Sequence, residues 1–267
     1  MPRFQGKIPS RKFFDWEVIS IAHIAHYVFD ATITYDDVAP DQRLSHGGAL
    51  RLMQEAAAVA SDLRGYGLKD IPRNGVAWIL TGWRLELLER PAWNTAISVE
   101  TWPRSMDGFI SDRDFLLRSG ETLVARGTSR WFLVSAATGR IVRITPEVRS
   151  AYELDETRVF PGGDDIPGNG KSPADAREAF SYTVGRRDID TNHHVNNIHY
   201  LDFALEALPQ AVYDHLPATV DVAFRKQILL GTPIRCLYAH LEDGRHQVEI
   251  RSGPEDAPVH HAFLWFY

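Results

Sequence analysis

Two similar segments, one in each half of the chain, restrict the fold more than any other feature of the sequence. DVAPDQRLSHGGALRLMQEAA begins at Asp37, and DIDTNHHVNNIHYLDFALEAL begins at Asp188. Laid together without a gap, they share the leading Asp, an apolar residue beside it, a polar loop and a helix-like run that carries Glu55 or Glu206. Internal similarity of this kind predicts a duplicated structural unit.

The similarity continues downstream of both segments. WRLELLERPAW, from Trp83, resembles FRKQILLGTPI, from Phe224, and RSGETLVARGTSRWF, from Arg118, resembles RSGPEDAPVHHAFLWF, from Arg251. We therefore interpret the two halves as diverged copies of one unit.

A turn-rich stretch separates the copies. PGGDDIPGNGKSP combines Gly, Pro and Asp at a density that does not hold regular structure, which is typical of a linker. We expect an N-terminal module over residues 1–160, a linker over 161–173 and a C-terminal module over 174–267.

Each copy combines one helix with several strands. Apolar residues recur at three- and four-residue intervals in both helix-like runs, and they are Ala49, Leu52, Met53, Ala56, Ala60 and Leu63, then Ile198, Leu201, Leu205 and Leu208. Ser45, and either Asn196 or Asn197, are the expected N-caps. TAISVETW, DRDFLLRSG, TSRWFLVS, HQVEIRSG and HHAFLWFY are typical of strands. The pattern predicts an α+β fold, in which an antiparallel sheet of about five strands curves around one helix, twice.

Composition excludes several classes of protein. A net charge of −6 argues against general nucleic-acid binding, and no apolar run is long enough to span a membrane. The lone Cys236 lies in a strand-like apolar run, which predicts a buried core thiol and no internal disulfide. The first twenty residues lack the apolar segment of a secretory signal. We therefore expect a cytoplasmic protein.

Three polar residues precede the second helix at alternate positions, and they are Asp190, Asn192 and His194. In an extended segment they would point the same way, towards a helix N-terminus that favours negative charge. The alternative is a capped turn, in which short polar side chains satisfy the backbone. A metal site built from Asp190, His194 and His199 fits no standard zinc spacing. We expect neither a metal nor a cofactor.

The same residues carry a family resemblance. DTNHHVNNIHYLDFALEALP is similar to the D-x-N-x-H-V-N-N signature of acyl-acyl-carrier-protein thioesterases, whose downstream F-R-K or Y-R-K stretch is FRK here. WILTGWRLELLERPAWNTAISVETWPR resembles the first module of that family. The resemblance runs from about Phe29 to the C-terminus. It implies a double hotdog fold and hydrolysis of fatty acyl thioesters, which releases free fatty acid and terminates elongation.

Carried over residue by residue, the resemblance implies that Asp190, Asn192, His194 and Gln227 are catalytic. Many members have Glu where this chain has Gln227, so the carboxylate usually proposed to activate water is absent. We expect His194 to act as the base, Asp190 to orient its ring or to take the proton, and Asn192 to hold the carbonyl or the water. Gln227 could position water but could not accept its proton.

The first copy lacks this set of residues. Its counterparts to the polar trio are Ala39, Asp41 and Arg43, and the sequence alignment sets Glu86 opposite Gln227. We therefore expect one active site per chain, with a degenerate site and an apolar acyl pocket in the N-terminal module. Candidate residues lining this pocket are Leu52, Met53, Ala56, Ala57, Trp78, Leu80 and Trp83.

The expected partner is an acyl-carrier protein that bears a phosphopantetheine-linked acyl chain. Carrier proteins are acidic, so docking needs a basic surface, for which the candidates are Arg186, Arg187, Arg225 and Lys226. An acyl-CoA thioesterase and a non-catalytic acyl-binding module are the alternatives. A monomer and a homodimer are equally compatible with the sequence.

Overall fold

The computed structural model describes residues 25–162, 166–168 and 170–267, and within them the strands form one antiparallel sheet. Its ten strands have the order β1-β3-β4-β5-β2-β7-β10-β9-β8-β6. The first copy supplies β1 (Tyr27–Thr32), β2 (Val76–Leu87), β3 (Ala96–Asp107), β4 (Ile110–Ser119) and β5 (Thr122–Ser135). The second supplies β6 (Arg177–Thr183), β7 (Thr219–Phe224), β8 (Pro233–His240), β9 (His246–Ser252) and β10 (Val259–Phe266). Residues 1–24, 163–165 and 169, within the predicted N-terminal module and linker, lie outside the described residues.

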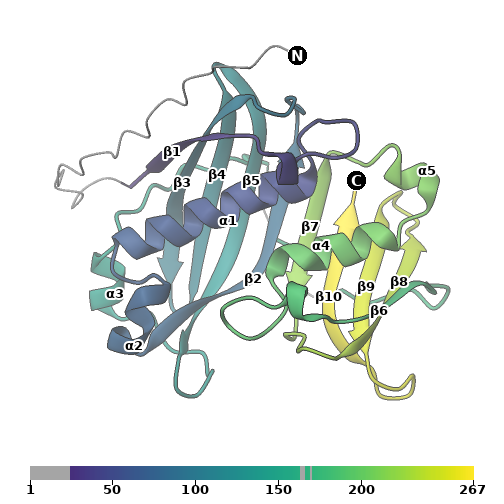
Figure 1. The fold of residues 1–267 in the computed structure, drawn as a ribbon. Helices are drawn as coiled ribbons and strands as arrows, with labels where there is room; N and C mark the ends of the chain where they lie inside the picture. Colours follow the sequence, from purple (N-terminus) through teal and green to yellow (C-terminus); the bar gives the residue numbers. More distant parts are fainter. Residues whose placement is uncertain (1–24, 163–165, 169) are drawn as a thin grey trace, which may run out of the picture.

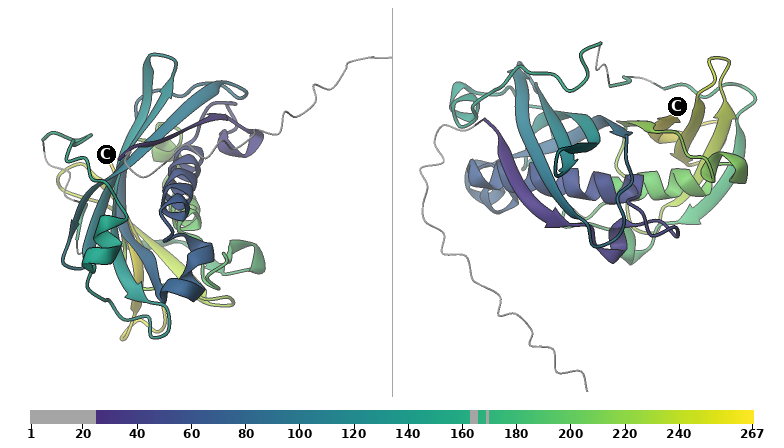
Figure 2. Two further views of the ribbon diagram at one scale, coloured as in Figure 1. Left: turned by 90° about the vertical axis from the view of Figure 1, so that its left-hand side faces the viewer. Right: turned by 90° about the horizontal axis from the view of Figure 1, so that it is seen from above.

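The two main helices lie on the same, concave face of the sheet (Figures 1 and 2). Helix α1 (His46–Leu63) crosses the strands of the first copy, and α4 (Asn197–Glu206) crosses those of the second. Short helices complete the chain, and they are η2 (Tyr35–Asp37), η3 (Leu68–Asp70), α2 (Ile71–Asn74), α3 (Pro146–Ser150), η4 (Arg186–Asp188) and α5 (Gln210–Tyr213). The predicted α+β architecture is confirmed. None of the helices in the described ranges is long and apolar enough to cross a membrane.

Local sequence explains where the main helices begin. The Ser45 hydroxyl accepts a hydrogen bond from the N–H of Gly48, and the Asn196 side chain accepts one from the N–H of Ile198. Each cap satisfies an amide that has no partner within its helix. Both predicted N-caps are therefore confirmed, with Asn196 as the cap of the second helix.

The two copies meet where β2 pairs with β7. The register sets Trp83 opposite Val222 and Arg84 opposite Asp221. The Arg84 Nε lies 2.7 Å from Asp221 Oδ1, and both side chains are largely buried. The paired strands make the sheet continuous across the two copies.

The duplication is visible in the backbone. Asp37 and Asp188, which are 151 positions apart, each end a short helix and accept a hydrogen bond at Oδ2 from the backbone N–H three residues earlier. The same offset relates Gln42 to His193, both of which have a positive φ. It also relates the bridges Val38↔Leu44 and Ile189↔Val195.

The structure corrects the alignment of the following strands. Leu44 N–H donates to Pro91 O, and its counterpart Val195 N–H donates to Ile228 O, both at 2.9 Å. Pro91 and Ile228 are 137 positions apart, so the residue opposite Gln227 is Arg90. The expected counterpart, Glu86, is wrong by four residues, because the apolar pattern of the two strands allows more than one gapless match.

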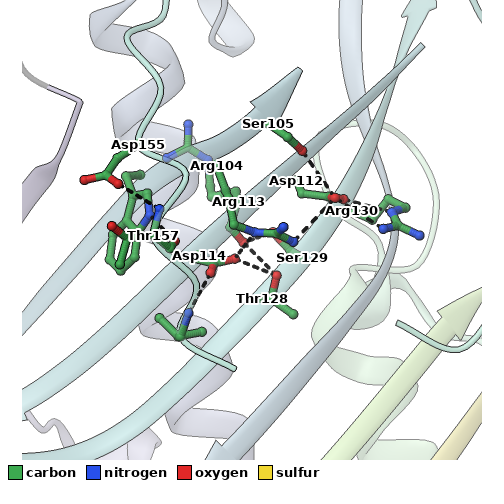
Figure 3. A network of polar contacts seen from close by, with 12 residues as sticks. Arg104, Ser105, Asp112, Arg113, Asp114, Thr128, Ser129, Arg130, Asp155 and Thr157 are labelled. Carbon is green, nitrogen blue, oxygen red and sulfur yellow. Dashed lines mark hydrogen bonds and ion pairs between the residues drawn. The ribbon is translucent and has the colours of Figure 1, made fainter. Parts of the chain in front are cut away.

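The connection between the copies begins on the convex face of the sheet. Val159 N–H donates to Asp114 Oδ2, and the Trp102 indole N–H donates to Thr157 O. Beneath this segment, Asp112 and Asp114 bind Arg104, Arg130 and Thr128 (Figure 3), so most of the buried charges on this face are paired.

The concave face carries the main apolar core. One cluster of buried side chains extends from Ile97 and Val99 of β3, through α1 and α4, to Val248 and Ile250 of β9. Cys236 belongs to this cluster, and burial raises the pKa of its thiol to about 12. The prediction of a buried core cysteine is therefore confirmed.

Candidate active site

The predicted trio lies on a tight turn, which corrects the expected extended segment. Asp190 N–H donates to His194 O at 2.9 Å, and His193 N–H donates back to Asp190 O at 3.1 Å. His193 has a φ of +64°, and Asp190 Oδ1 accepts the N–H of Asn192 at 2.8 Å. The alternation of faces in a strand therefore does not apply. The turn forms because a short carboxylate satisfies the backbone inside it.

The turn still brings the predicted side chains together. The Asn192 amide nitrogen lies 3.4 Å from Asp190 Oδ2, and His194 Nδ1 lies 3.9 Å from Asp190 Oδ1. His194 Nδ1 is also 3.3 Å from Val195 O. Asp190 and His194 are half-buried, and Asn192 is exposed. The histidine ring therefore has a carboxylate beside it and remains accessible.

Gln227 lies on the neighbouring segment. Its side chain is exposed, and the next residue, Ile228, is buried and accepts the N–H of Val195. This bond sets the segments that carry His194 and Gln227 side by side.

The first copy shows how close the Asn192 and Gln227 positions come. Their counterparts are Asp41 and Arg90, whose side chains form two hydrogen bonds of 2.7 and 3.0 Å. In the first copy, the backbone therefore places the counterparts of two predicted positions within contact distance of each other.

Two buried residues support the site and were not predicted from the sequence. The Tyr200 hydroxyl accepts the N–H of Ile228 at 3.2 Å, and burial, together with the charge of Asp190, raises its pKa. His261 Nδ1 lies 2.9 Å from Lys226 O, and burial lowers the pKa of this ring. Both occupy apolar-looking runs of the sequence, which gave no signal of a role.

A cavity of about 390 Å³ opens between the first turns of α1 and α4. Its wall includes Asn196, two positions after His194, and it also contains Arg51, Gln54 and His199. The hydrogen bond to Asp202 raises the pKa of His199. The cavity therefore reaches the N-cap that follows the predicted trio.

The candidate acyl pocket remains a prediction. Leu52, Met53, Ala56, Ala57 and Trp83 pack in the main core, Leu80 is buried, and Trp78 joins a separate cluster with Tyr152. A second cavity, of about 500 Å³, lies beside Arg64 and Tyr152. Neither of these two cavities is lined by the seven candidates.

The arrangement provides groups that hydrolysis of an acyl compound needs. An accessible imidazole beside a carboxylate can accept a proton from water, and Asn192 offers amide donors at the same turn. The helix that follows begins at Asn197, and its first N–H groups favour a developing negative charge.

Comparisons with known proteins fit this geometry. The family model described as "Acyl-ACP thioesterase N-terminal domain" matches residues 26–152, and "Acyl-ACP thioesterase C-terminal domain" matches residues 171–264. Oleoyl-acyl carrier protein thioesterase 2 of Arabidopsis thaliana is 29% identical over 160 residues, or 56% of this chain and 44% of that protein. A dodecanoyl-[acyl-carrier-protein] hydrolase of Cinnamomum camphora is 26% identical over 214 residues, or 75% of this chain and 56% of that protein. The chain thus spans about half the length of these curated relatives.

Solved structures confirm the fold. An acyl-ACP thioesterase from Bacteroides thetaiotaomicron superposes with a TM-score of 0.76 at 20% identity, covering 91% of this chain and 98% of that one. The 12:0-ACP thioesterase from Umbellularia californica gives 0.77 at 20% identity, covering 91% and 97%. With both family domains matched in order along most of its length, the chain belongs to the acyl-ACP thioesterase family.

Proposed function

We propose that this chain hydrolyses fatty acyl thioesters of acyl-carrier protein and releases free fatty acid. The observation that carries the proposal is the turn at Asp190–His194, which holds an accessible histidine 3.9 Å from a carboxylate, directly before the N-terminus of α4. The curated relatives are named as thioesterases or hydrolases of acyl-carrier-protein substrates. Hydrolysis would end fatty-acid elongation. A cytoplasmic location remains a prediction.

In the proposed reaction, His194 accepts a proton from water as the water attacks the thioester carbonyl. Asp190 keeps the ring oriented and stabilises its charged form. The Asn192 amide and the free N–H groups at the start of α4 stabilise the negative charge on the carbonyl oxygen. The leaving thiolate needs little help, since thiols are much more acidic than alcohols.

A basic surface beside the turn fits an acidic carrier protein. Arg186, Arg187, Arg225 and Lys226 are all exposed. Of these, only Arg187 lies within ion-pair distance of a carboxylate in the described part of the chain, at 3.6 Å from Asp188. Cations that have no internal partner are free to pair with a docked anionic protein.

The test is an assay of purified protein on acyl-carrier-protein, acyl-CoA and acyl-N-acetylcysteamine thioesters of several chain lengths. We expect free fatty acid from the carrier-protein substrate, at a rate that falls steeply with salt, and a weaker salt effect on the small neutral thioester. Arg225→Glu should lower kcat/KM for the carrier-protein substrate only. Faster turnover of acyl-CoA would instead favour the acyl-CoA thioesterase.

Variants of the turn separate catalysis from structure. His194→Ala and Asp190→Asn should each lower kcat by roughly 10²–10⁴-fold. Asp190→Asn keeps an oxygen that can accept the N–H of Asn192, so the turn persists while the charge is lost. Near-wild-type turnover in both variants would remove the assignment.

Gln227, which cannot accept a proton, is the one residue that favours a non-catalytic acyl-binding protein. In that case the assay would detect bound acyl thioester and no free fatty acid.

A further inference from the structure

A row of polar residues crosses the concave face of the sheet beneath α1. Antiparallel pairing sets Trp83 of β2 opposite Ser129 of β5, and Ser129 opposite Arg113 of β4. Thr101 of β3, which pairs with Phe115 rather than with Arg113, joins this set because Arg113 donates to its hydroxyl at 3.2 Å. All four are buried. We call these residues the polar row.

Apolar side chains lie on both sides of the polar row, and Trp83 and Trp131 themselves pack with the main core. On one side, Leu85 and Phe115 lie opposite Gly127 in the main core, where a Cβ on Gly127 would meet the sulfur of Met53 from α1. On the other side, Leu133 packs with Tyr152 in a separate cluster. A chain running along the inner face from the main core would therefore meet the polar row before it reached Leu133.

The two hydroxyls of the polar row have partners. Ser129 Oγ accepts from the Trp131 indole at 2.7 Å, and Thr101 Oγ1 donates to Asp114 O at 2.9 Å. Neither hydroxyl is left over to bind a ligand.

The nitrogen donors of Trp83 and Arg113 differ from the hydroxyls, because they have few partners within the part of the protein that the structure describes. Trp83 Nε1 is buried and has no hydrogen-bond partner among the described residues. Arg113 is only 5% exposed. Within the described ranges it makes the single bond to Thr101 and no ion pair with a carboxylate, and burial lowers its pKa to about 10. A buried donor without a partner is costly, as is a buried cation without a counter-ion, so this part of the interior favours an oxygen atom and disfavours a methylene group.

The position of Arg113 suits a limit to the length of the predicted acyl pocket. Arg113 lies on β4, which is separated from β7 by β2 and β5. At the usual spacing of about 4.8 Å, the three steps from β7 to β4 amount to roughly 14 Å. Strand β7 leads at its end to Gln227, and Ala56, Ala57 and Ala60 are the small residues on the buried side of α1.

We propose that Arg113, with Trp83, forms a polar end wall that sets the longest acyl chain the enzyme accepts. The inference rests on the proposed thioesterase function and deepens it by naming residues that determine specificity. An alkyl chain that stops before the polar row buries its methylenes against apolar side chains. A longer chain must pack its methyl end against donors that it cannot satisfy.

The experiment measures kcat/KM for straight-chain acyl thioesters of increasing length on the wild type, Arg113→Met, Arg113→Lys and Trp83→Phe. Met fills a similar volume without charge, Lys keeps the charge, and Phe removes only the indole N–H with part of its ring. We expect Arg113→Met to raise kcat/KM for chains two carbons beyond the wild-type limit, relative to the wild-type optimum, by on the order of tenfold. Trp83→Phe should give a smaller shift, and Arg113→Lys should keep the wild-type limit.

A second measurement needs no variant. At the first length that the wild type rejects, an ω-hydroxyacyl thioester should be hydrolysed faster than the alkyl thioester of equal length, because its oxygen can accept from Arg113 or Trp83. This comparison of substrates tests the end wall even if Arg113→Met does not fold.

The outcomes are distinguishable from failure of the proposed function. A wild type that hydrolyses no thioester at any length contradicts the thioesterase function itself. An active wild type, with an unchanged length profile in both Arg113→Met and Trp83→Phe and no advantage for the ω-hydroxyacyl substrate, overturns the end wall alone.

Discussion

Gln227 corresponds to Arg90 of the first copy, a charged residue whose side chain contacts that of Asp41. Arg90 binds Asp41 there, and it also donates from Nε to Leu44 O at 2.9 Å. In the second copy the corresponding residues are Gln227 and Asn192, which are both neutral and exposed. The same backbone thus holds an ion pair in one copy and two amides, beside a histidine, in the other.

We predict that Gln227→Glu raises kcat or shifts the acid limb of the pH–rate profile. The new carboxylate would stand beside the segment of His194 and could share the task of accepting a proton from water. The pH dependence of kcat on one thioester measures the effect, with Gln227→Ala as the control for loss of an amide that positions water. A profile for Gln227→Glu that coincides with that of the wild type would show that no second base is needed.

For single residues, the sequence predicted which side chains lie close together but not the backbone conformation that brings them together. Asp190, Asn192 and His194 do converge, yet they do so through a turn that the alternating pattern cannot distinguish from a strand. Tyr200 and His261 contact the backbone beside the site, and such contacts depend on folding of distant segments. No local pattern can therefore reveal them.

The first turn of α1 contains two neighbouring glycines with different surroundings. A Cβ on Gly48 would lie 2.2 Å from the carbonyl oxygen of Asp37, so the helix start packs directly on the backbone of η2. A Cβ on Gly47 would find its nearest atom, Ser45 Oγ, at 3.8 Å, which is an ordinary contact.

We predict that Gly48→Ala lowers the free energy of unfolding by about 1–3 kcal/mol, because a methyl group overfills the contact with Asp37. Gly47→Ala is the matched control, and it should raise the free energy of unfolding by about 0.5 kcal/mol, since Ala is the better helix former. Urea denaturation measures both. Equal effects of the two substitutions would contradict the close approach seen at Gly48.

Elements were predictable to the extent that their signals are local. The apolar stripe and the caps at Ser45 and Asn196 located both main helices, and alternation located strands such as β3 and β9. The sequence alignment of β2 with β7 was wrong by four residues. The correct alignment follows from backbone hydrogen bonds to distant segments, which the sequence pattern does not reveal. The continuity of the sheet through β2 and β7 likewise follows from packing between the copies.

Across the whole molecule, His26 connects segments that are distant in the chain. Its Nδ1 lies 2.7 Å from Glu100 of β3, and its Nε2 lies 2.9 Å from Asp155, in the connection that follows α3. Its ring stacks on Trp102 at 4.5 Å. Burial alone would lower the pKa of His26, but the hydrogen bonds to Asp155 and Glu100 outweigh burial, so the pKa is raised.

We predict that this contact stabilises the fold at low pH and weakens as the pH rises. A histidine whose pKa is higher in the folded state contributes fully below its unfolded value of about 6.5, and the contribution is lost as the pH passes through the folded value. The urea midpoint of the wild type should therefore fall more between about pH 6 and about pH 8.5 than that of His26→Gln. If the urea midpoints of the wild type and His26→Gln fall by the same amount over this range, the histidine carries no charge there.

The pairing of β2 with β7 has a consequence for exchanging parts between relatives. Neither strand is an edge, so each copy completes the sheet of the other, and Arg84 reaches across to Asp221, which also accepts the Tyr267 hydroxyl at 3.0 Å. A chimera that takes its N-terminal half from one homologue and its C-terminal half from another must therefore match two interlocking surfaces as well as join one connector. The proposed end wall in the first copy and the proposed catalytic residues in the second would have to be transferred together with the paired strands that join them.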